Sequence, residues 1–199
     1  MMAPVSVPLF PLGTVLFPGG LLPLKIFEQR YLDMTKACLK DGTPFGVCLI
    51  REGMEVGTAA VPETVGCLAT IEEWDMPHPG LFHLLGRGSE RFRIRDMQVA
   101  ANHLISATVD AIAPDAPAEV DALCRGALKA IIEQVGAGRF PAPLRLDDAA
   151  WVGYRLCLVL PLYARFKQEL LELTDAAARL AQPRALLEKQ GLNRQDLQD

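Results

Sequence analysis

The sequence predicts an α+β protein with a β-rich unit over residues 1–113 and a helical unit over residues 114–199. Short apolar runs separated by turn residues fill the first part, which is typical of strands in a barrel or sandwich. After about residue 113, apolar residues recur at steps of three and four, which indicates amphipathic helices. The chain has 199 residues and is 50% hydrophobic, so it can bury a core without a disulfide or metal.

No charged side chain precedes Lys25, so the opening segment needs an explanation. A secretory signal would begin with basic residues, and a membrane helix would need an unbroken apolar helix. Recurrent prolines prevent such a helix because each lacks a backbone donor and clashes with the preceding turn. We therefore expect short strands and turns here, and a cytoplasmic protein with no membrane span. The prolines are Pro4, Pro8, Pro11, Pro18 and Pro23.

The β-rich unit is predicted to hold one helix among its strands. Apolar side chains at Phe27, Tyr31, Met34 and Cys38 follow a helical period over residues 27–39, and Gly42 can end that helix. Turns are predicted at residues 52–53, at Pro62, and at residues 77–80 and 86–88, with residues 18–20 as a structural turn. Strands are predicted at residues 22–26, 45–50, 58–61, 67–71, 81–85, 92–94 and 104–112.

Four helices are predicted in the second unit. The first covers residues 120–135, and the second runs from residue 149 toward Pro161 with Asp147 or Asp148 as its N-cap. The third carries Leu170 and Leu171, and the fourth ends at Gly191. Pro183 should either kink the fourth helix or begin a new one. The polar residues 193–199 are expected to fray.

The residues that would mark an enzyme or a metal site do not form a motif in this sequence. There is no phosphate-binding loop, dinucleotide fingerprint or nucleophile elbow, so we assign no catalytic residue and no cofactor. The three histidines are scattered, and none of the cysteines has the close spacing of a metal knuckle. We interpret the cysteines as small buried hydrophobic residues in a reducing compartment, and no metal is expected. They are Cys38, Cys48, Cys67, Cys124 and Cys157.

Arginines alternate with apolar residues at Arg91, Arg93 and Arg95, and Arg87 precedes them. In a strand this spacing places the guanidinium groups on one face. One interpretation is a half-buried strand with a solvated outer face, and the other is a surface for an anionic ligand or acidic peptide. The net charge of −4 and the pI of about 5.4 count against a general nucleic-acid binder.

Residues 8–19 read PLFPLGTVLFPG and residues 22–31 read LPLKIFEQRY. This order strongly resembles the N-terminal domain of the Lon protease family. Later segments agree with the same family: the V-G-T turn at residues 56–58, the strand pair at residues 84–94, and the helical pieces LPL, KQ, LLE and RL between residues 160 and 180. The resemblance covers about residues 5–190.

The resemblance implies a PUA-like β pseudobarrel with one inserted helix, followed by a C-terminal helical bundle. It also implies a stand-alone, non-catalytic domain that binds unfolded segments, peptides or a partner protein, without the ATPase and protease modules of a full Lon protease. On this basis the candidate contacts are Phe17, Phe27 and Tyr31 from the family motif, together with Arg87, Arg91 and Arg93. Core packing is the other interpretation of Phe17, Phe27 and Tyr31.

Two other functions stay open at this stage. PUA-like folds include RNA-binding modules, although the acidic balance counts against RNA as a partner. A small-molecule-binding protein with a cryptic enzymatic role is the other alternative. The partner's identity and the oligomeric state cannot be read from the sequence.

Overall fold

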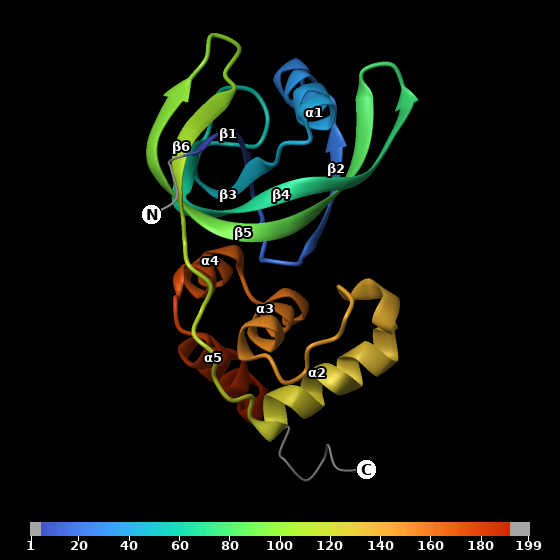
Figure 1. Cartoon of the computed structure of the whole chain (residues 1–199), viewed down its shortest axis with the longest axis vertical. Helices are drawn as coiled ribbons and strands as arrows, with labels where there is room; N and C mark the ends of the chain where they lie inside the picture. The colour runs from blue at the N-terminus through green and yellow to red at the C-terminus, as the bar shows by residue number, and fades with distance from the viewer. Residues whose placement is uncertain (1–4, 192–199) are drawn as a thin grey trace. The chain divides into compact units, whose positions relative to one another are not determined.

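The structure is a computed structural model that describes residues 5–191. The described residues form two compact units that divide between Ile112 and Ala113, one residue before the predicted boundary. The first unit is a mixed sheet with one helix, and the second is helical (Figure 1), so the predicted α+β class is confirmed. Within the described residues, no helix is both long enough and apolar enough to cross a membrane.

Six strands build the first unit, in the sheet order β2-β5-β4-β3-β1-β6. A further pairing of β5 with β6 closes five of the strands into a ring, while β2 pairs with β5 alone. The pairing of β1 with β3 is parallel, and every other pairing is antiparallel. The strands are β1 (Val5–Leu12), β2 (Leu21–Ile26), β3 (Phe45–Glu52), β4 (Val61–His78), β5 (Leu81–Val99) and β6 (Ile105–Ala111).

Strands β4 and β5 are much longer than predicted. The short strand expected at residues 58–61 is wrong, because β4 begins only at Val61, and the turns expected at Pro62 and at residues 86–88 lie inside strands. Register shifts let both strands bend while their pairing continues. Gly88 sits inside β5 for a steric reason: a Cβ there would collide with the carbonyl oxygen of Phe17.

The predicted inserted helix is α1 (Gln29–Asp41), which follows directly from β2. It begins two residues later than expected and ends at Gly42, whose φ of 64° is left-handed as a C-cap requires. Its apolar face packs into the ring against Phe10, Phe45 and the other strand residues of the main core. The helix therefore anchors the end of β2 to the main core of the first unit.

The second unit holds α2 (Ala122–Val135), α3 (Ala149–Val159), α4 (Ala164–Glu172) and α5 (Ala176–Lys189), with a 3-10 turn at Ala137–Arg139. The structure decides the choice of N-cap for α3, since the Asp148 carboxylate accepts the Trp151 N–H at 3.0 Å. Helix α5 continues through Pro183, so no new helix begins there. The frayed end expected at residues 193–199 lies outside the described residues.

A buried charge holds the second unit together. The Arg179 guanidinium is fully buried and donates to the Asp115 carboxylate and to the carbonyl oxygens of Leu170 and Leu173. It also lies 4.3 Å from the centroid of the Tyr154 ring. These contacts join the segment before α2 to the end of α4 and the start of α5.

Candidate functional site

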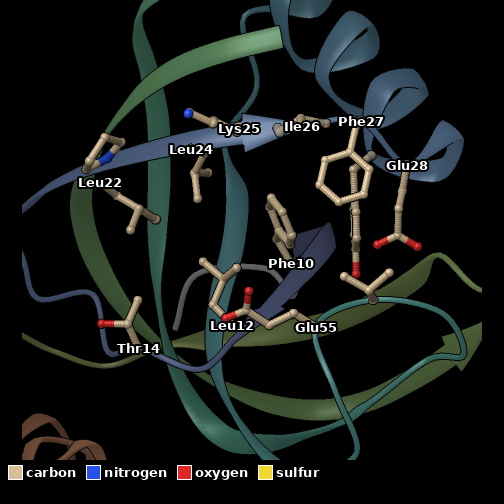
Figure 2. A pocket seen from close by; sticks show the side chains of 13 residues that line it. Phe10, Leu12, Thr14, Leu22, Leu24, Lys25, Ile26, Phe27, Glu28 and Glu55 are labelled. Carbon is tan, nitrogen blue, oxygen red and sulfur yellow. The ribbon is translucent and has the colours of Figure 1, made fainter. Parts of the chain in front are cut away.

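A pocket of about 290 Å³ opens in the first unit, between β2, β1 and the start of α1 (Figure 2). Its lining is mainly aliphatic and aromatic, with two carboxylates and one lysine. A concave apolar lining with a few polar groups is the usual composition of a binding site. The lining residues are Phe10, Leu12, Thr14, Leu22, Pro23, Leu24, Lys25, Ile26, Phe27, Glu28, Tyr31, Glu55 and Val56.

One border of the pocket is a strand edge with no partner among the described residues. Strand β2 bonds to β5 on one side, and its other side faces β1, to which it is not paired. The Gly88 N–H donates to the Gly20 oxygen at 2.8 Å, so the register makes Leu22 and Leu24 bond to β5. The backbone groups of Leu21, Pro23 and Lys25 therefore point to the open edge.

The two faces of β2 differ in the same alternating way. Leu22 and Ile26 are buried and Leu24 is half-buried, whereas Leu21, Pro23 and Lys25 are exposed. Figure 2 shows the Leu22 and Leu24 side chains directed toward Phe10 and Leu12 across the pocket, with Lys25 on the other side of the strand. A strand added to this edge would direct every second side chain into the pocket.

Aromatic rings form one wall of the pocket. The rings of Phe10 and Tyr31 stack with their centroids 4.0 Å apart, and the Arg30 guanidinium lies 4.6 Å from the Tyr31 centroid. Burial raises the pKa of Tyr31, an effect that Arg30 opposes and that the carboxylates of Glu28 and Glu55 reinforce. The Tyr31 hydroxyl is therefore a neutral hydrogen-bonding group at physiological pH.

The loop between β3 and β4 crosses the pocket and is tied down by two carboxylates. Glu55 of this loop accepts the Gly13 N–H at 2.6 Å, and Glu28 accepts the Gly57 N–H of the same loop at 3.3 Å. Glu28 also receives a hydrogen bond of 3.1 Å from the buried Arg30. These contacts place Val56, which is 53% exposed, at the pocket rim.

The structure separates the three aromatic candidates. Phe27 is 58% exposed and lines the pocket, while Tyr31 is 5% exposed and lines it with one part of its ring. Phe17 is fully buried and does not line the pocket. The burial of Phe17 favours the core-packing interpretation of this residue over a contact with a ligand.

The arginine candidates do not form one exposed cationic surface. Arg91 and Arg93 pair with β4 in unbroken register, so they lie on the same face of β5, but Arg91 is only 3% exposed. Arg87 bonds to Glu72 and Arg95 bonds to Asp110, which offsets their charges, and Arg93 is exposed on β5. Register shifts in β5 separate Arg87 from Arg91 and Arg93 from Arg95, so strict alternation does not hold over the whole run. None of these arginines lines the pocket.

Sequence reasoning missed most of the pocket lining, including Phe10, Leu24, Glu28 and Glu55. Two signals were present, because Glu28 belongs to the IFE motif and Val56 to the V-G-T motif of the family pattern. All five cysteines are buried, as predicted, and none of them forms a disulfide. Burial raises the pKa of Cys157 to about 12, so this thiol stays protonated at neutral pH. Residues 5–191 contain no cluster of three metal-binding side chains.

The family model for the ATP-dependent protease La (LON) substrate-binding domain matches residues 6–189. The chain belongs to this family. Among curated relatives, Lon protease 2 of Herpetosiphon aurantiacus is 28% identical over 88% of the chain, and Lon protease 2 of Myxococcus xanthus is 32% identical over 55% of it. The chain spans only 23% and 13% of the length of these two proteins, so its match lies in the substrate-binding domain.

Two solved structures of Lon N-terminal domains share the fold. The Lon N-terminal domain protein from Xanthomonas campestris is 36% identical, has a TM-score of 0.76, and covers 91% of this chain and 98% of its own. The N-terminal domain of the Mycobacterium avium complex Lon protease is 19% identical with a TM-score of 0.64, covering 92% of this chain and 97% of its own. The predicted Lon N-terminal fold, a barrel followed by helices, is confirmed.

Proposed function

We propose that this Lon substrate-binding domain binds extended, unfolded segments of other proteins in the pocket beside β2. The observation that carries the proposal is an apolar pocket of about 290 Å³ next to a strand edge whose backbone groups are open. The edge offers hydrogen bonds that do not depend on sequence, and the pocket offers apolar contact for alternate side chains. Folded proteins present neither extended backbone nor such side chains freely.

Phe27 and Tyr31 are the contacts we propose from the original candidates. Phe27 is exposed at the rim, so its ring gains buried area only when a ligand is bound. Tyr31 supplies a rigid floor because its ring is stacked on Phe10 and covered by Arg30. We also propose that the chain itself is non-catalytic, and that it is cytoplasmic, in keeping with five buried cysteines that form no disulfide.

Binding of labelled, unstructured peptides rich in aliphatic residues tests this function by fluorescence anisotropy. Phe27→Ala should weaken binding about tenfold, since a rim aromatic is a common energetic anchor. Trp74→Ala is the matched control, because Trp74 is also about half exposed but does not line the pocket. Equal effects of the two substitutions, or no binding by the unsubstituted protein, would overturn the proposal.

A further inference from the structure

Resting on the proposed function, we infer that the pocket selects extended segments that carry a lysine or arginine beside an apolar anchor, and that it disfavours segments with an acidic residue there. Glu28 and Glu55 place two carboxylates in the pocket lining. Glu28 is 21% exposed and Glu55 is exposed, so a basic side chain of a bound segment can reach either carboxylate.

Glu55 is the more available of the two carboxylates. One of its oxygens accepts the Gly13 N–H, and its other oxygen forms no hydrogen bond among the described residues. Figure 2 shows the Glu55 carboxylate beside Leu12, on the side of the pocket that faces β2. A basic side chain of a bound segment can therefore donate to Glu55 without breaking its contact with Gly13.

Pairing with Arg30 offsets the charge of Glu28, so the preference depends mainly on Glu55, which has no ion-pair partner among the described residues. The Arg30 guanidinium is buried and already bonds to Glu28. Lys25 is the one lysine or arginine in the pocket lining, and Figure 2 shows its amino group across β2 from Glu55. The pKa of Tyr31 agrees with this picture: burial raises it most, Arg30 lowers it, and both carboxylates raise it further.

Strand geometry places the basic residue in the bound segment. In a segment added to β2, the side chain beside Leu24 enters the pocket among Phe10 and Leu12. The side chain two residues away lies on the same face, where the pocket lining continues toward Glu55 or Glu28 depending on the direction of the segment. The selected pattern is therefore apolar-x-basic or basic-x-apolar.

The test compares three labelled peptides that share an alternating apolar sequence and differ only in the flanking position, which holds Lys, Ser or Glu. We expect the Lys peptide to bind about five times more tightly than the Glu peptide at low salt, with less difference at high salt. Glu55→Gln keeps an acceptor for the Gly13 N–H but removes the charge, so it should remove most of this preference. Glu133→Gln changes the net charge equally at an exposed site of α2 and is the control.

Each outcome bears on a different statement. Equal binding of the three peptides, or a preference that Glu133→Gln removes as well as Glu55→Gln does, overturns the inference about basic residues while the peptide-binding function stands. Failure of all three peptides to bind overturns the function and the inference together. A Lys preference lost only in Glu55→Gln supports both.

Discussion

The two units share a buried arginine–tyrosine contact but differ in how the charge of the arginine is paired. Each buries an arginine over a tyrosine ring, Arg30 over Tyr31 in the barrel unit and Arg179 over Tyr154 in the helical unit. Arg179 is paired with a carboxylate that is itself fully buried. The carboxylate partner of Arg30 is Glu28, which is 21% exposed at the pocket, and the Arg30 Nε has no hydrogen-bond partner within residues 5–191.

This difference is consistent with the proposed ligand site in the barrel unit. In the helical unit, the Arg179 charge is satisfied by a buried carboxylate and two carbonyl oxygens, so this charge contributes to the architecture. In the barrel unit, Glu28 lines the open pocket beside a strand edge, and its partner Arg30 lies buried behind it over the Tyr31 ring. Unsatisfied groups next to exposed apolar surface are costly unless a ligand completes them.

The largest expected effect comes from breaking the fully buried ion pair between Arg179 and Asp115. Arg179→Met keeps much of the side-chain volume but leaves the Asp115 carboxylate buried without its partner, which should cost about 3–5 kcal/mol of unfolding free energy. Arg30→Met should cost about 1–2 kcal/mol, because Glu28 can turn toward water. Urea unfolding curves of the two variants measure the contrast. Equal losses would show that the two arginines are not differently satisfied.

The next effect concerns the crowding of the barrel interior. A Cβ at Gly66 would meet the Val47 carbonyl oxygen, the Phe92 ring and the Cys48 sulfur, so Gly66→Ala should cost about 1–3 kcal/mol. Gly86→Ala is the control on the same sheet, because its Cβ would have neighbours no closer than 3.6 Å. Thermal unfolding measures both. A loss of stability for Gly86→Ala as large as that for Gly66→Ala would contradict the explanation by steric crowding at Gly66.

The same regions show which parts of the fold could be predicted from local sequence patterns. Local patterns predicted α1 and the helical unit, because apolar spacing at helical steps survives tertiary packing in Tyr31, Met34 and Cys38. They divided β4 and β5 wrongly, since Pro62 and Gly88 look like turn residues. Only contacts distant in sequence, such as Gly88 against Phe17, explain why the strands continue.

The candidate site also depends on contacts between residues distant in sequence, which local patterns do not predict. Phe27 and Tyr31 were identified through the family pattern, but the pocket exists because β2, β1 and a loop more than twenty residues away meet. No local period could place Glu55 beside Gly13. The arginine alternation misled for a related reason: register shifts on either side of Arg91 and Arg93 change the faces of the flanking arginines, and no local pattern shows that Arg91 is buried.

A smaller effect is expected from helix capping in the helical unit, where α2, α3 and α5 have aspartate N-caps. Asp148→Ala removes the acceptor for the Trp151 N–H and should cost about 1 kcal/mol. The neighbouring Asp147 is exposed and pairs only with Arg125 in the described structure, so Asp147→Ala should cost less than about 0.5 kcal/mol. Chemical denaturation distinguishes the two. A larger loss at Asp147 would reverse the assignment of the cap.

The smallest effect tests the open edge of the barrel unit directly. Pro23 points its ring nitrogen toward this edge, where it has no N–H to donate, and a proline is a known way to protect an edge strand from unwanted pairing. Pro23→Val restores a donor there, and one added hydrogen bond should raise peptide affinity about threefold. Leu21→Val is the control, because it changes an outward side chain on the same edge without adding a donor. Anisotropy titrations measure both variants, with sedimentation to detect self-association.

Because bound segments compete with a second copy of β2 for the same backbone groups, tighter peptide binding should come with a greater tendency to self-associate. Unchanged affinity in Pro23→Val would mean that the segment contacts the pocket through side chains and does not pair with β2.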